Sequence, residues 1–148
     1  MYKHLLAATD GSELATKAVL HAAQLAKESE AKLTIVVVTD PWPVLEMTQK
    51  AVENKSDPIS VFEKHASDHA AGVLANAARV AEGVGIRVQT MHVADARPAQ
   101  GILDAAARLE CDAIVMSTHG RRGLRRVVLG SQASDVIADA KVPVIVVK

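Results

Sequence analysis

Short runs of apolar residues alternate along the chain with segments in which apolar residues recur every three or four positions. Buried β-strands are predicted from four of the runs: His4–Thr9, Lys32–Val38, Ala113–Met116 and Val142–Val147. Amphipathic helices are predicted between them, beginning near Leu14, Phe62, Pro98 and Ser131. Strands that alternate with helices form a parallel sheet with right-handed crossovers, so helices are expected on both faces.

A fifth strand is predicted at Ile86–Val93, where apolar and polar residues alternate. Alternation indicates one solvent-exposed face, as at the edge of a sheet. The preceding helix is expected to end at Gly83 and Gly85. Residues 40–60 show no clear period, which predicts a long loop with one helical turn near Met47–Val52.

The 148 residues match the usual size of one domain, which we expect to span residues 1–148. The predicted fold class is α/β: a doubly wound, five-stranded parallel sheet of Rossmann-like type. Hydrophobic residues make up 49% of the chain but aromatic residues only 2%, so the core must consist of Val, Ile, Leu and Ala. So few aromatic rings argue against a stacking platform for single-stranded nucleic acid.

The charge balance is neutral, with 17 basic and 17 acidic residues. Such a chain has no net field to attract DNA or an anionic membrane, and no apolar run approaches the roughly 18 residues that span a bilayer. The lone Cys111 excludes an internal disulfide and fits a reducing compartment. We therefore expect a cytoplasmic protein without a nucleic-acid or membrane partner.

The segment Ser117–Ser131, after the fourth predicted strand, combines glycines with arginines. Ligands of open parallel sheets bind beyond the carboxyl ends of the strands. Glycines let backbone N–H groups approach a ligand, and the start of the last helix carries positive partial charge. Four arginines lie within six residues: Arg121, Arg122, Arg125 and Arg126. Phosphate accepts hydrogen bonds both from backbone N–H groups and from guanidinium groups, so the segment predicts a phosphate site. The alternative is a solvated basic loop whose glycines only make turns.

Several kinds of site are excluded or disfavoured by the sequence. No G-x4-G-K-S/T and no G-x-G-x-x-G after the first strand is present, which excludes the ordinary P-loop and dinucleotide domains. His65 and His69 are spaced one helical turn apart but lack a third ligand, so we interpret them as a polar pair. Cys111 lies between two acidic residues and is expected to be inert. No base is placed to activate water, so we expect no catalytic residues and at most slow hydrolysis of a bound phosphate compound.

Two stretches, Met116–Ser131 and Val142–Val147, resemble the universal stress protein family, and the similarity extends over the whole chain, including Ala8–Ser12. The nucleotide-binding branch of that family has the pattern Gly-x2-Gly-x9-Gly-Ser/Thr. This chain matches it at Gly120, Gly130 and Ser131.

Ser117 stands where the family pattern has its first glycine. If a positive φ is required there, serine would cost about 1–2 kcal/mol, roughly tenfold or more in affinity. If only close approach is required, the hydroxyl could donate to a phosphate.

The resemblance implies that the chain binds ATP and pairs into a homodimer through its last strand, Val142–Val147. An unpaired apolar edge strand would otherwise favour aggregation. The resemblance also places Asp10 near the ribose or a phosphate-bound Mg²⁺, and the backbone of Val38 near adenine. Asp10 is in addition a good N-cap for the first helix. The residues expected to contact the nucleotide are Ala8, Thr9, Asp10, Val38, Met116, Ser117, His119, Gly120, Arg121, Arg122, Gly130, Ser131 and Gln132.

Three functions are therefore considered. The first is an ATP-binding stress or signalling module whose nucleotide state alters its shape or partners. The second is an interaction module of the same fold that binds no nucleotide and acts through its dimer surface or residues 40–60. The third, an adenylating enzyme, is disfavoured because its Ser-Gly-Gly or H-x-G-H motif is missing.

Overall fold

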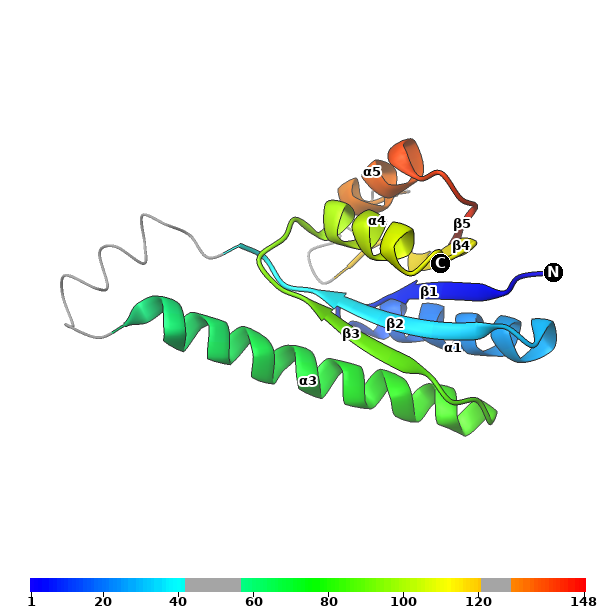
Figure 1. The fold of residues 1–148 in the computed structure, drawn as a ribbon, viewed down its shortest axis with the longest axis horizontal. Coiled ribbons are helices and arrows are strands. Elements are labelled where there is room, and N and C mark those ends of the chain that lie inside the picture. Colours follow the sequence, from blue (N-terminus) through cyan, green and yellow to red (C-terminus); the bar gives the residue numbers. More distant parts are fainter. Residues whose placement is uncertain (42–56, 121–128) are drawn as a thin grey trace.

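The computed structural model describes residues 1–41, 57–120 and 129–148. Its centre is a five-stranded parallel sheet with strand order β3-β2-β1-β4-β5 (Figure 1). The strands are β1 (His4–Ala8), β2 (Lys32–Val38), β3 (Gln89–Val93), β4 (Ala113–Ser117) and β5 (Val144–Val147). The helices are α1 (Glu13–Ser29), α3 (Pro58–Val84), α4 (Pro98–Arg108) and α5 (Ser131–Asp139). The predicted α/β class and the parallel Rossmann-like sheet are confirmed.

Successive residues of each strand point to opposite faces, which divides the core into two layers. Leu5 and Ala7 of β1 pack with α1 and α3, whereas Leu6 and Ala8 pack with α4 and α5. Figure 1 shows these two helix pairs on opposite sides of the sheet. The prediction of helices on both faces is therefore confirmed. The strand order reverses between β1 and β4, and this is where open α/β sheets bind their ligands.

Both edge strands are shorter than the sequence predicted. β3 starts at Gln89 rather than Ile86, because the N–H of Ile86 still closes the end of α3 by donating to Ala81 at 3.4 Å. β5 starts at Val144 rather than Val142, because the intervening Pro143 has no N–H to donate. The predicted position of β3 at a sheet edge is confirmed.

The ends of α3 also correct the prediction. The helix starts at Pro58 instead of near Phe62, since Asp57 caps it by accepting the N–H of Ser60 at 3.2 Å and proline suits the first helical position. Gly83 lies inside the helix, and only Gly85, with φ of 94°, ends it. The helical turn predicted at Met47–Val52 lies outside the described residues.

Candidate functional site

The first wall of the candidate site is the turn that follows β1. The N–H of Thr9 still bonds to Val36 at 3.0 Å, and Gly11 then adopts φ of 83° to reverse the chain. Oδ1 of Asp10 accepts the N–H of Ser12 at 2.9 Å. Ser12, not Asp10, is the N-cap of α1, so that part of the Asp10 prediction was wrong. Asp10 instead braces the turn, which holds its carboxylate at the carboxyl end of β1.

The second wall starts at Ser117, the last residue of β4. It pairs with Val147 in an ordinary strand conformation, and it is not among the described residues with positive φ. The backbone cost considered for a serine here therefore does not arise. Its hydroxyl donates to the carbonyl of His119 at 2.7 Å, so the single O–H is used within the loop rather than left for a phosphate.

Two glycines bring the walls together. A Cβ on Gly120 would collide with Oδ2 of Asp10, and one on Gly130 would lie 2.8 Å from the carbonyl oxygen of Thr118. The N–H of Gly130 donates to that same oxygen at 2.7 Å, which closes the ends of the loop on each other. The sequence predicted that glycines in this segment let backbone N–H groups approach a ligand; in the structure Gly120 and Gly130 also let the protein's own loops approach each other.

The start of α5 faces this junction. Gly130 is its N-cap and supplies no side-chain hydrogen bond, and Ser131 and Gln132 in the first turn are exposed. Oε1 of Gln132 accepts the N–H of Ala99 in α4 at 3.0 Å. The first backbone N–H groups of α5 thus lack a capping side chain of their own, a condition suited to an anion.

His119 carries an unsatisfied polar atom at the same place. Its Nδ1 lies 3.1 Å from Oγ1 of Thr118, and its Nε2 is buried without a hydrogen-bond partner in the described parts of the chain. A buried polar atom without a partner costs about 1–3 kcal/mol. An unsatisfied buried group of this kind needs an explanation, and an ion or ligand bound beside it is one.

The remaining predicted contacts lie on the α4 and α5 side of the sheet. Ala8 and Met116 are buried there, at the ends of the adjacent strands β1 and β4. Both methyl groups of Val38 press on Gly101 of α4, where a Cβ would lie 2.8 and 2.9 Å from them. The Val38 side chain therefore belongs to the core, and only its backbone could face a base.

The four arginines of the predicted phosphate site lie outside the described residues: Arg121, Arg122, Arg125 and Arg126. Across residues 1–41, 57–120 and 129–148, no three or more His, Cys, Asp or Glu side chains are grouped to hold a metal ion. A metal at Asp10 would thus take most of its coordination from other oxygens, such as those of hydroxyls, carbonyls, phosphates or water.

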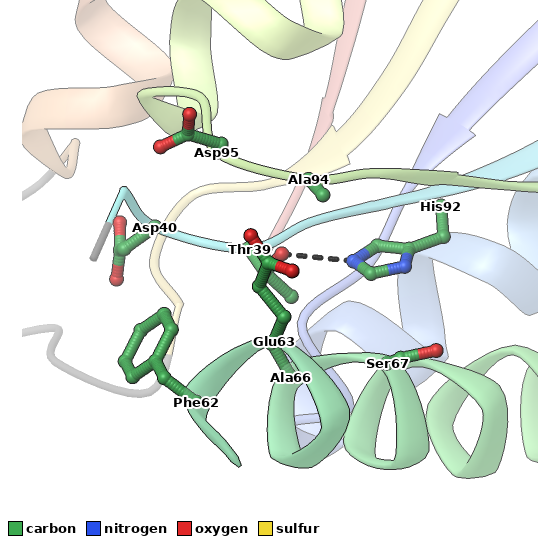
Figure 2. Close-up of a pocket in the computed structure, with 9 residues that line it drawn as sticks. All are labelled: Thr39, Asp40, Phe62, Glu63, Ala66, Ser67, His92, Ala94 and Asp95. Atoms are coloured by element: carbon green, nitrogen blue, oxygen red, sulfur yellow. Dashed lines mark hydrogen bonds between the residues drawn. The ribbon is translucent and has the colours of Figure 1, made fainter. Parts of the chain in front are cut away.

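A second hollow, which the sequence analysis missed, lies at the carboxyl ends of β2 and β3 (Figure 2). It has a volume of about 390 Å³ and is lined by Thr39, Asp40, Phe62, Glu63, Ala66, Ser67, His92, Ala94 and Asp95. Oγ1 of Thr39 and Nε2 of His92 are 2.8 Å apart in its wall. In the sequence, only the polar pair Thr39–Asp40 after β2 pointed to this hollow. The α3 residues that line it showed only helical periodicity, which does not indicate that they lie next to Thr39 and Asp40.

Within the described ranges, no helix has the length and apolarity to cross a membrane. The chain is 34% identical over 148 residues to universal stress protein MJ0531 of Methanocaldococcus jannaschii, covering all of this chain and 83% of that protein. It is 32% identical over 151 residues to a universal stress protein of Thermus aquaticus encoded beside a sulfhydrylase gene, with both chains fully covered.

Solved structures repeat the fold. MJ0577 superposes with a TM-score of 0.79 at 29% identity, covering 100% of this chain and 96% of that one. A universal stress protein in complex with cAMP superposes with a TM-score of 0.75 at 23% identity, covering 99% and 97%. One from Archaeoglobus fulgidus in complex with dAMP reaches 0.70 at 21%, covering 100% and 98%. The model of the universal stress protein family matches residues 1–148, and the chain belongs to that family.

Proposed function

We propose that this protein binds ATP at the rim formed by the β1 turn, the end of β4 and the first turn of α5, and that it works as a nucleotide-dependent stress or signalling module. The observation that carries the proposal is the meeting of Asp10, Gly120 and Gly130 at the point where the strand order reverses. We propose adenine as the base because related structures are complexes with cAMP and dAMP.

The residues of the rim fit a nucleotide phosphate. The first turn of α5 has no capping side chain, and Nε2 of His119 has no hydrogen-bond partner among the described residues. Bound phosphates would supply the negative charge that helix N–H groups favour, and Asp10 would help to hold a Mg²⁺ that accompanies them. The sequence pairs no base with an orienting carboxylate for attacking water, so we propose binding with slow or no hydrolysis.

The proposal includes a homodimer in the cytoplasm. β5 is an edge strand whose four residues are all partly exposed, and two copies could extend the sheet by pairing there. Val146→Lys places a charge on this strand and is expected to yield monomers by light scattering after gel filtration. Monomers of the unchanged protein at the same concentration would refute the dimer.

The decisive test of nucleotide binding adds charge at the first turn of α5. Ser131 is exposed, so Ser131→Glu should fold, and a carboxylate at a helix start even favours the helix. It would nevertheless repel a phosphate, so ATP affinity should fall about tenfold or more, while the neutral Ser131→Gln keeps most of it. Equilibrium dialysis with labelled ATP measures both variants.

A second variant tests the closed loop. Gly130→Val pushes a side chain against the Thr118 carbonyl, and we expect about 30-fold weaker ATP binding with a folded core. Gly72→Ala is the matched control, since nothing lies within 4 Å of a Cβ there. If the unchanged protein retains no ATP at millimolar concentration, the proposal fails and the interaction module without nucleotide takes its place.

A further inference from the structure

We propose that Gln132 is a positioning residue that couples the two ends of the nucleotide site by capping α4 from the first turn of α5. The inference rests on the proposed function, because the coupling concerns the nucleotide. Gln132 contributes through Oε1, which accepts the N–H of Ala99 across the gap between the two helices. These residues are 33 positions apart, so the contact exists only in the folded chain.

α4 needs this cap because its own sequence supplies none. Its N-cap residue is Arg97, whose guanidinium has no acceptor and makes no capping hydrogen bond. Pro98 follows at the first helical position and has no N–H. Ala99 is thus the first residue of the helix with an N–H to satisfy, and a glutamine on another helix does what Ser, Thr, Asp or Asn normally do at the N-cap.

The cap matters for the site because the first turn of α4 touches the end of β2. Gly101, two residues after Ala99, packs directly on the methyl groups of Val38, with no room for a Cβ between them. Val38 is the residue whose backbone is expected to face the base, whereas Gln132 follows Ser131 in the turn expected to receive the phosphates. One side chain therefore links the base end of the site to its phosphate end through a single helix turn.

Such a link makes binding at the two ends interdependent. A phosphate that orders the first turn of α5 also orders Gln132, and thereby the position of α4 on Val38. Coupling of this kind is reciprocal, so the base and the phosphates should each strengthen the binding of the other. Loss of the cap should weaken even a ligand that has no phosphate.

The experiment compares Gln132→Ala and Gln132→Glu, with Ser134→Ala on the exposed side of α5 as the control. Hydrogen exchange of the Ala99 amide reports the cap directly, without any nucleotide. We expect exchange about tenfold faster in Gln132→Ala, and protection retained in Gln132→Glu, since a carboxylate accepts the same N–H. Ser134→Ala should exchange as the unchanged protein does.

Binding of adenosine and of ATP then tests the coupling. Gln132→Ala should weaken adenosine several-fold, and Gln132→Glu should restore adenosine affinity while still weakening ATP through its charge. Equal Ala99 exchange in the unchanged protein and Gln132→Ala would overturn the cap. A changed exchange rate with equal adenosine affinity would overturn the coupling. If neither ligand binds the unchanged protein, the coupling falls together with the proposed function, while the Ala99 exchange still decides the cap.

Discussion

The two ends of the parallel sheet differ in how completely their polar groups are satisfied within the protein. At the amino end, His4 lies with Nδ1 3.1 Å from the carbonyl of Leu109 and Nε2 2.8 Å from Oγ1 of Thr34. The carboxylate of Asp112 accepts the N–H groups of Lys3 and His4 at 2.7 and 3.2 Å. At the carboxyl end, α5 has no side-chain cap and Nε2 of His119 has no partner in the described residues.

Because of this difference, we expect the amino end to affect mainly the stability of the fold and the carboxyl end to affect ligand binding as well. A polar group satisfied within the protein stabilises the fold, whereas one left over at the point where the strand order reverses costs stability and is available for a ligand. Substitutions at the amino end should therefore lower the free energy of unfolding without changing ATP affinity. Substitutions at the carboxyl end should change ATP affinity as well.

The largest effect is expected for His4→Ala. It removes both contacts of the imidazole and leaves the hydroxyl of Thr34, only 2% exposed, without this partner. We expect a loss of about 2–3 kcal/mol in the free energy of unfolding, measured by urea denaturation. ATP affinity should not change. His21→Ala, on the exposed side of α1, is the control; a tenfold change in ATP affinity with His4→Ala would contradict the division between the two ends.

Gly101→Ala tests the carboxyl half, where α4 meets β2. The new methyl group would lie 2.8 Å from a methyl group of Val38, and the overpacking should cost about 1–2 kcal/mol. Here ATP affinity should also fall, because the end of β2 must move. Gly72→Ala, in the open part of α3, should instead stabilise by roughly 0.5–1 kcal/mol. Unchanged ATP affinity in Gly101→Ala would show that α4 does not shape the site.

Asp112, at the amino end of the sheet, makes the stability of the fold depend on pH. Burial by itself would raise the pKa of this carboxyl, but the hydrogen bonds from the N–H groups of Lys3 and His4 outweigh it and lower the pKa below its ordinary value. Its contribution to stability is therefore complete above the unfolded pKa, near 3.9, and is lost as the pH falls through the lower folded pKa.

Asp112→Asn should cost about 1 kcal/mol at pH 7 and lose less on acidification than the unchanged protein. Urea denaturation at pH 7 and pH 3 measures both values. Parallel losses in the two proteins would show that other carboxyl groups carry the acid sensitivity.

The smallest change is expected for alkylation of Cys111 in the folded protein. Burial, and then the charge of Asp112, raise the pKa of its thiol to about 11, and the side chain is 5% exposed. The thiolate is thus scarce at pH 8, and alkylation of the folded protein should be negligible over a time in which the urea-unfolded chain reacts fully. Rapid alkylation without urea would mean that the amino end opens readily.

Local signals in the sequence were sufficient for most of the fold. The β-branched run at Lys32–Val38, the proline at the start of α4 and Gly85 after α3 each appear where predicted, because they act through the conformation of neighbouring residues. One prediction failed where two local signals competed. Asp10 and Ser12 are both good N-caps, and only the bend at Gly11 decided in favour of Ser12.

The site was predicted less completely. The pattern of Gly120 and Gly130 pointed to the carboxyl end of β4, and the neighbours of these glycines there are Asp10 and the Thr118 carbonyl. Ser117 could not be judged from its identity, because its φ and the acceptor of its hydroxyl depend on β5 and on His119. The hollow lined by Thr39 and His92 had only the polar pair Thr39–Asp40 as a local signal, since β2, β3 and α3 come from distant parts of the chain.

By itself the sequence determined which segments become strands and helices, and in what order they follow, because periodicity and turn residues act over a few positions. Only the tertiary structure decided that β1 lies beside β4, that Asp10 meets Gly120, and that Gln132 caps α4. Such contacts join residues far apart in the chain, and their free energy is gained only once the sheet has assembled.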